Sequence, residues 1–298
     1  MSVKKMFLET RPQFLLLSPI LSFLGMAIAL YNGSFNTLYF ILAGVGLLLL
    51  HASVNTLNDY SDYRTGVDLR TRRTPFSGGS GFLPSGLLKP STVLTIGLGS
   101  IILATPIGIY FLAKRGLQLL PLFVIGAIFV LFYTSHIARV GLGLSEISAG
   151  LGLGVLPVIG TFIIIHGDFS YSALYASMPS FFLVFNLLLL NEIPDTEADK
   201  SGRRRTLPIQ FGVKAAATIY SALIIITYLW ILFGALAKLM PYWSLLALLT
   251  LPLGLKAIKG AMTFKAIEEL IPAQGANVMT VLLTQLFLGI GYMLAWGL

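Results

Sequence analysis

The sequence predicts an all-α, polytopic membrane protein in which about nine transmembrane helices surround a central cavity. The 298 residues are 56% hydrophobic and only 11% charged, whereas soluble domains average about 25% charged residues. Apolar runs of roughly the 20 residues that a helix needs to cross the hydrocarbon layer recur along the chain. Polar residues are concentrated in short segments between these runs. A water-soluble globular protein is therefore excluded.

The candidate spans are bounded by charged residues and by turn-forming glycines and prolines. They cover residues 13–31, 36–56, 91–113, 117–136, 144–166, 171–190, 213–236, 241–259 and 276–297. The first apolar run, from Phe14 to Leu30, is longer than the apolar part of a signal peptide and lacks a clear small-residue cleavage site. It is therefore interpreted as the first span.

The distribution of Lys and Arg predicts the orientation of the helices. With a cytoplasmic N-terminus, seventeen of the twenty basic residues lie in the cytoplasm, and Lys114, Arg115 and Lys238 lie outside. Cytoplasmic loops carry an excess of Lys and Arg. The sequence thus predicts a cell-membrane protein with its C-terminus outside. The net charge of +8 is interpreted as a topology signal and a source of anion ligands, with no nucleic-acid partner.

The chain contains no cysteine, which excludes disulfides, zinc–thiolate sites, iron–sulfur clusters and thiol nucleophiles. His51 and His136 have no partner at ligand spacing. They are interpreted as polar residues satisfied within the fold.

Two acidic segments occupy corresponding places in the two halves of the chain. Each lies at the cytoplasmic end of an even-numbered span and is followed by an Arg-rich loop and a new apolar helix. We therefore expect one transmembrane domain over residues 1–298, with a faint duplication of about 13–136 and 144–259 and a final helix over 276–297. Equivalent helix ends would face one another across the cavity.

The first acidic segment follows the second span. If that helix continues, Asn58 and Asp62 are four residues apart and Asp59 and Asp62 are three apart, so these side chains share one face. Gly66 suits a helix end, which leaves Asp68 on the loop just beyond it. The segment therefore concentrates oxygen ligands at one helix end.

The second acidic segment places Asn191, Asp195 and Asp199 at successive i, i+4 positions. A carboxylate costs about 2.5–3.5 kcal/mol at the centre of a membrane helix, and several together repel one another, so a cation is required. Oxygen ligands without thiols or paired imidazoles favour Mg²⁺, which typically completes its shell with waters and substrate phosphates.

Basic residues in the following loops would complete a diphosphate site, because Arg binds phosphate oxygens through forked hydrogen bonds. The loop cations are Arg70, Arg72, Arg73, Lys200, Arg203, Arg204 and Arg205. Positive-inside bias alone also accounts for the run from Arg203 to Arg205, and that alternative stays open.

The two acidic segments resemble the aspartate-rich motifs of the UbiA superfamily of intramembrane aromatic prenyltransferases, which are nine-helix proteins. The resemblance rests on Asn58-Asp-x-x-Asp62-x-x-x-Gly66-x-Asp68 and Asn191-x-x-x-Asp195-x-x-x-Asp199. The third acid of the first motif is Asp68, whereas the ubiquinone-type pattern would have an acid at position 66, which is Gly66 here. This spacing is similar to that of the menaquinone-type branch. That branch comprises the 1,4-dihydroxy-2-naphthoate prenyltransferases and their animal relatives that make vitamin K2. Further segments resemble this branch: Gly78 to Gly86, Tyr133-Thr, Gly141 to Glu146, Pro157 to Thr161 and Thr206 to Gly212.

The resemblance implies an enzyme that transfers a polyprenyl group from an allylic polyprenyl diphosphate to an aromatic acceptor. The C1–O bond breaks, diphosphate leaves, and the ring of the acceptor attacks the allylic cation. Two Mg²⁺ ions bridging the diphosphate are implied, with membrane lipid around the protein. The metal ligands carried over are Asn58, Asp59, Asp62, Asp68, Asn191, Asp195 and Asp199. Among these, the catalytic residues are Asp62, Asp68, Asp195 and Asp199.

The substrate-binding candidates are Asn58, Asn191, Arg72, Arg73, Lys200, Arg203, Tyr133 and Glu146. Glu146 is a candidate for acceptor binding, since an acid within a membrane helix usually faces a cavity. Tyr133 faces either the cation or the acceptor, or is an ordinary interfacial Tyr.

Other functions stay open at this stage. The acceptor could be a glycerol-phosphate ether lipid, or a haem or chlorophyll precursor. A divalent-cation transporter would explain the carboxylates, but the neighbouring Arg clusters would repel a permeating cation. The compact Asp-Gly-x-x-Ala-Arg signature of CDP-alcohol phosphotransferases is absent from the sequence.

Overall fold

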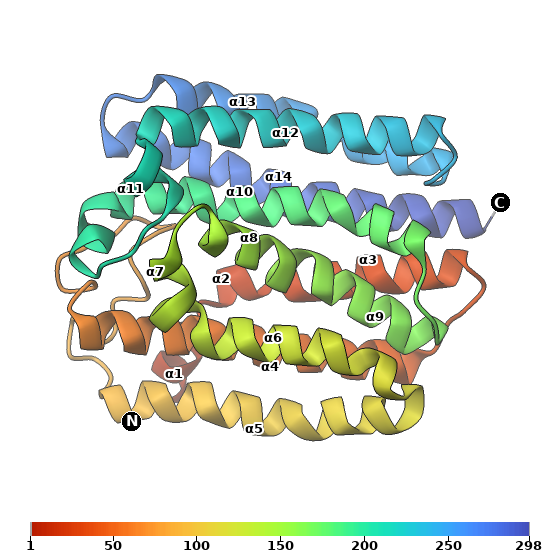
Figure 1. Cartoon of the computed structure of the whole chain (residues 1–298), viewed down its shortest axis with the longest axis horizontal. Coiled ribbons are helices and arrows are strands. Elements are labelled where there is room, and N and C mark those ends of the chain that lie inside the picture. Colours follow the sequence, from red (N-terminus) through yellow and green to blue (C-terminus); the bar gives the residue numbers. More distant parts are fainter. Residues whose placement is uncertain (1, 298) are drawn as a thin grey trace.

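The computed structural model describes residues 2–297, and this part of the chain folds into helices and loops without strands. Figure 1 shows the long helices lying side by side along the long axis of the molecule. Among the described residues, nine helical stretches are long and apolar enough to cross a membrane: Pro12–Tyr31, Thr37–Thr65, Pro90–Arg115, Leu117–Val140, Leu144–His166, Tyr171–Ser201, Val213–Leu236, Tyr242–Thr263 and Ile267–Trp296. The predicted all-α architecture is confirmed.

Five of these stretches are single helices: α4 (Thr37–Thr65), α5 (Pro90–Arg115), α10 (Tyr171–Ser201), α12 (Val213–Leu236) and α14 (Ile267–Trp296). The first combines α2 (Pro12–Leu15) and α3 (Leu17–Tyr31), and the eighth combines η4 (Tyr242–Thr250) and α13 (Leu251–Thr263). The fourth contains η1 (Leu117–Leu119), α6 (Leu120–Phe132), the π-helix η2 (Tyr133–Ile137) and α7 (Ala138–Val140). The fifth contains α8 (Leu144–Gly150), the π-helix η3 (Leu151–Val155) and α9 (Leu156–His166). Two short helices, α1 (Val3–Glu9) and α11 (Leu207–Phe211), lie outside the spans.

Three helices extend beyond the predicted apolar runs. α4 and α10 continue to Thr65 and Ser201, so all motif residues of the two acidic segments except Asp68 lie in the last turns of these helices. α14 begins at Ile267 rather than at 276. Glu268 and Glu269 lie in its first turn, where negative charge favours the start of a helix. In each of these helices the apolar run is shorter than the helix, because the polar turns beside it are also helical.

α3 lies at the centre of the bundle, where Leu21, Leu24 and Ala27 are fully buried. It packs against α4, α9 and α14. Gly25 permits a close approach to α9, since a Cβ atom there would lie 2.5 Å from the carbonyl oxygen of Val158. Small residues allow membrane helices to pack with their backbones close together.

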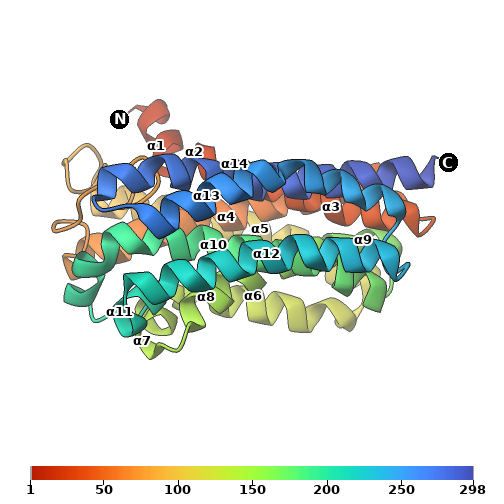
Figure 2. The same ribbon diagram turned by 90° about the horizontal axis from the view of Figure 1, so that it is seen from above.

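One end of the bundle collects the acidic segments and their loops. The N-terminus, α11 and the last turns of α4 and α10 lie at this end, and the C-terminus lies at the other (Figure 1). Figure 2 shows α1 projecting from the same end beside α2. Between the C-terminal end of α4 and the C-terminal end of α10, the chain passes through four spans. Both motifs therefore lie at the same end of the bundle.

Candidate active site

A cavity of about 560 Å³ lies among α4, α5, α6, α9 and α10. Apolar residues such as Leu47, Ile107, Phe123 and Leu156 line much of it. The acidic motifs line its polar end with Asn58, Asp62, Asp68, Asn191, Asp195 and Asp199. The structure therefore brings six predicted motif residues onto one cavity that continues as an apolar channel.

Local backbone geometry brings Asp68 back towards the end of α4. Gly66 adopts φ +79° at the C-cap of the helix, a left-handed conformation that glycine accepts readily. The backbone N–H of Asp68 then donates to the carbonyl oxygen of Asp62 at 3.3 Å. Burial, followed by the nearby carboxylates of Asp62 and Asp59, raises the pKa of Asp68 to about 8.

Arg204 joins the two acidic segments. Its guanidinium donates to Asp62 of α4 and, at 2.8 Å, to Asp199 of α10. The Arg204 side chain is 14% exposed. Burial alone would lower the pKa of Arg204, but the carboxylates of Asp62 and Asp199 raise it above its ordinary value. Arg204 is therefore a fixed positive charge between the motifs.

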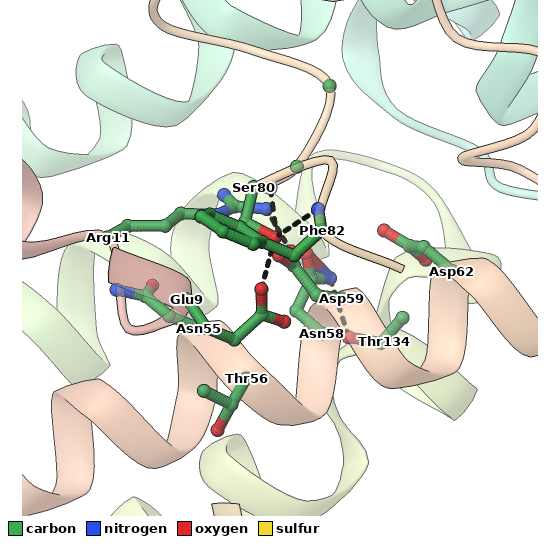
Figure 3. Close-up of polar contacts among 12 residues, drawn as sticks. Glu9, Arg11, Asn55, Thr56, Asn58, Asp59, Asp62, Ser80, Phe82 and Thr134 are labelled. Atoms are coloured by element: carbon green, nitrogen blue, oxygen red, sulfur yellow. Dashed lines mark hydrogen bonds and ion pairs between the residues drawn. The ribbon is translucent and has the colours of Figure 1, made fainter. Parts of the chain in front are cut away.

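Arg11 provides the positive charge beside Asp59 (Figure 3). It forms an ion pair with Asp59, which also accepts a hydrogen bond from the backbone N–H of Ser80 at 2.8 Å. The Ser80 hydroxyl donates to Glu9 at 2.5 Å. Burial, with a further contribution from Asp59, raises the pKa of Glu9 to about 7. Asp59 thus faces this network, and it does not line the cavity.

A glycine-rich loop covers the acidic cluster. The backbone N–H of Gly78 donates to Asp195 at 3.1 Å. At Gly79, with φ +71°, an added Cβ atom would lie 3.0 Å from a carboxylate oxygen of Asp68. The loop backbone can approach the carboxylates this closely because these positions carry no side chain.

The four basic residues predicted to bind the substrate, Arg72, Arg73, Lys200 and Arg203, do not line the cavity. Arg72 is 76% exposed and pairs with Glu268, and Lys200 pairs with Glu197 at 2.9 Å. Arg73 donates to the backbone carbonyl oxygens of Gly79 and Ser80. Arg203 is exposed at the surface. Their contact with diphosphate stays a prediction.

Tyr133 and Glu146 differ in how they relate to the cavity. Tyr133 begins the π-helix η2 and lines the cavity, and π-helical turns are frequent at functional sites. Glu146 is fully buried but does not line the cavity. It accepts hydrogen bonds from the Leu207 backbone N–H and the Ser145 hydroxyl, both at 2.7 Å, so it fixes the start of α11.

Sequence reasoning missed Arg11 and Glu192 and did not distinguish Arg204 within its basic run. All three line the cavity. Glu192 carries the signal used for Glu146, an acid within a membrane helix. Arg11 precedes the first span and carries no signal that separates it from an ordinary topology residue.

The donor set at the polar end fits Mg²⁺. Within residues 2–297, no three His, Cys, Asp or Glu side chains form a ready-made metal cage, and Arg11 and Arg204 pair with Asp59, Asp62 and Asp199. One carboxylate oxygen of Asp195 is nevertheless buried without a hydrogen-bond partner among the described residues. Mg²⁺ usually binds through one or two carboxylates plus waters and substrate phosphates, so a complete protein cage is not required.

The UbiA prenyltransferase family matches this chain over residues 16–263. The chain belongs to this family. It is therefore an integral-membrane UbiA prenyltransferase, and the expected enzyme class is confirmed.

Two curated relatives are similar to this UbiA prenyltransferase over most of its length. The 1,4-dihydroxy-2-naphthoate octaprenyltransferase of Bacillus subtilis (strain 168) is 27% identical over 290 residues, which cover 96% of this chain and 91% of that protein. UbiA prenyltransferase domain-containing protein 1 of Xenopus tropicalis is 28% identical over 239 residues, covering 77% and 66%.

Solved structures share the fold. The apo structure of a UbiA homolog from Aeropyrum pernix K1 has a TM-score of 0.70 at 17% identity and covers 94% of this chain and 97% of that chain. A UbiA homolog from Archaeoglobus fulgidus bound to DMAPP and Mg²⁺ has a TM-score of 0.65 at 16% identity, with coverages of 96% and 99%.

Proposed function

We propose that this UbiA prenyltransferase transfers a polyprenyl group from an allylic polyprenyl diphosphate to an aromatic quinone precursor, in the synthesis of a menaquinone-type lipid quinone. The observation that carries the proposal is one cavity with two acidic motifs and two largely buried arginines at its polar end and an apolar channel beyond. The 1,4-dihydroxy-2-naphthoate octaprenyltransferase of Bacillus subtilis supports the choice of acceptor.

The motif residues would hold Mg²⁺ together with the diphosphate: Asp62, Asp68, Asp195 and Asp199, with the amides of Asn58 and Asn191. When bound, Mg²⁺ withdraws charge from the leaving group, and we propose two ions. The homolog of Archaeoglobus fulgidus bound to DMAPP and Mg²⁺ supports the presence of the metal and of a prenyl diphosphate. Arg11 and Arg204 would neutralise phosphate charge that the metal leaves uncompensated. The amide of Asn58 is oriented by donating to Thr134 at 2.9 Å.

The apolar channel would hold the prenyl chain and keep water from the reactive C1 carbon. Ile109 of α5 and Leu131 of α6 line the cavity and are 60% and 50% exposed, so a lipid-soluble chain can reach the channel from the side. Excluding water protects a reactive intermediate from hydrolysis. Catalysis would then consist of stabilising the leaving group and positioning the acceptor ring.

Incubation of purified protein with a labelled allylic diphosphate and a panel of acceptors tests the proposal. We expect prenylated dihydroxynaphthoate as the product, complete loss of turnover in EDTA and recovery with Mg²⁺. Because the two motifs would act on one diphosphate, Asp62→Ala and Asp195→Ala should each abolish most transfer, with the double variant hardly worse than either. Transfer only to an ether-lipid precursor would reject the aromatic acceptor, and full turnover in EDTA would reject the metal.

A further inference from the structure

Glu192 is a buried acid whose role the motif residues do not explain. It lies on α10, is 6% exposed and lines the cavity. Its Oε2 atom is buried without a hydrogen-bond partner among the described residues. Buried polar atoms nearly always have a partner, so an unpaired carboxylate oxygen on a residue that lines a cavity calls for a ligand group.

The position of Glu192 along α10 defines which part of the substrate it meets. Leu188, one turn earlier, lines the apolar channel, and Asp195 and Asp199, one to two turns later, line the polar end. Glu192 therefore lies at the junction of the two regions. With diphosphate at the polar end and the prenyl chain in the channel, C1 lies at this junction, and the attacking ring must lie there too.

The carboxyl group of Glu146 is the nearest acidic neighbour of Glu192. Glu146 is fully buried, does not line the cavity, and accepts hydrogen bonds from the Leu207 backbone N–H and the Ser145 hydroxyl. The carboxyl group of Glu146 is therefore satisfied by the protein itself, whereas Glu192 Oε2 has no hydrogen-bond partner among the described residues.

We propose that Glu192 Oε2 accepts a hydrogen bond from a ring hydroxyl of the acceptor and so selects hydroxylated aromatic substrates. This inference rests on the proposed aromatic acceptor. A ring that attacks a cation needs an electron-donating substituent, and a hydroxyl offers both electron density and a donor for Oε2. The hydrogen bond would also fix which ring carbon faces C1. Tyr133 lines the same cavity from η2.

Comparison of Glu192→Leu, Glu192→Gln and wild type on a hydroxylated acceptor and its mono-O-methyl ether tests this role. Wild type and Glu192→Gln should prefer the hydroxylated compound by about tenfold or more, since a site built to accept a substrate hydroxyl rejects the analogue that lacks it. Glu192→Leu should lose that preference through a higher acceptor KM. The KM for prenyl diphosphate and the Mg²⁺ requirement should stay unchanged. Glu197→Gln, exposed on the same helix, is the matched control.

Each other outcome overturns a defined part of the idea. Retained preference in Glu192→Leu rejects the hydrogen bond, and a raised Mg²⁺ requirement makes Glu192 a metal ligand instead. Equal loss in Glu192→Gln and Glu192→Leu rejects the hydrogen bond to a side-chain oxygen, because Gln retains one. If Glu192→Leu does not fold, as judged by its melting temperature in detergent, Glu192→Ala takes its place. Failure of wild type to prenylate any aromatic ring contradicts the proposed function and not the role of Glu192 alone.

Discussion

The Arg204 side chain forms ion pairs with both acidic segments. Two carboxylates from different helices share its guanidinium within a site that excludes most solvent. Removing one partner from a buried ion pair is strongly destabilising, because it leaves an uncompensated buried charge. The residue next to it, Arg203, is exposed and offers a natural comparison.

We expect Arg204→Ala to lower the free energy of unfolding by about 3 kcal/mol and to abolish most prenyl transfer. Arg203→Ala should change the free energy of unfolding very little, since exposed charges contribute little. Thermal melting in detergent with EDTA measures both variants. Mg²⁺ with pyrophosphate should recover part of the stability of Arg204→Ala. Equal melting temperatures for the two variants would contradict the bridging role.

Glu9 predicts a pH dependence of stability. Its pKa is raised from 4.5 to about 7, so the folded chain favours the protonated acid and ionisation destabilises it. The loss in free energy of unfolding caused by ionisation of Glu9 is absent below about pH 4.5, grows between about pH 4.5 and 7, and is constant at higher pH. At pH 8 it is on the order of 3 kcal/mol, at about 1.4 kcal/mol per pKa unit.

Glu9→Gln should therefore be more stable than wild type at pH 8 and nearly equal to it at pH 4.5, because Gln stays uncharged. Melting curves across this range measure the difference. Glu197→Gln, whose carboxylate is 86% exposed, should follow wild type throughout. A difference between Glu9→Gln and wild type that does not change with pH would reject this explanation.

At the scale of elements, the loop from Gly78 to Gly81 connects the two acidic helices. It donates to Asp195 of α10 through Gly78 and to Asp59 of α4 through Ser80. Gly79 and Gly86 both have positive φ, but a Cβ atom at Gly86 would meet nothing within 4 Å. Substitutions at these two glycines therefore distinguish the effect of backbone strain from the effect of contact with the carboxylates.

We expect Gly79→Ala to lower kcat/KM at least tenfold and Gly86→Ala to leave it nearly unchanged. Both substitutions carry a backbone cost of about 1 kcal/mol, but only the methyl group at position 79 presses on Asp68. Steady-state kinetics with melting controls measure the difference. Similar losses in both variants would assign the effect to strain alone.

At the scale of the whole molecule, the two sides predicted from the Lys and Arg distribution correspond to the two ends of the helix bundle. The acidic segments, their loops and the N-terminus lie at one end, and the C-terminus lies at the other (Figure 1). Lys114 and Arg115 lie in the last turn of α5, and Lys238 follows α12. The predicted membrane orientation places the loop end in the cytoplasm.

Cysteine labelling tests this orientation, since the chain has no cysteine of its own. Ser201 ends α10, Lys238 follows α12, and both residues are exposed. These two helix ends lie at opposite ends of the molecule (Figure 1). In intact cells, an impermeant thiol reagent should label Lys238→Cys and should label Ser201→Cys only after the membrane is opened. Labelling of Ser201→Cys from outside would invert the topology.

The sequence by itself determined the fold class and the motif positions, because both depend on local patterns. A helix must present about 20 apolar residues to lipid, and i, i+4 spacing alone places Asn191, Asp195 and Asp199 on one face. The continuation of α4 and α10 through the acidic segments is the helical geometry that this spacing assumes. The start of α14 at Ile267 was missed because a polar helical turn and a polar loop have similar compositions.

Only the tertiary structure decided which charges meet. Arg11 and Arg204 are largely buried and pair with the acidic motifs, while Arg72 and Lys200 pair with surface acids. Asp59 turns towards Ser80, and Glu192 lines the cavity while Glu146 fixes α11. These outcomes depend on how helices distant in sequence rotate and pack against one another, and spacing within one segment carries no information about the partner that another segment brings.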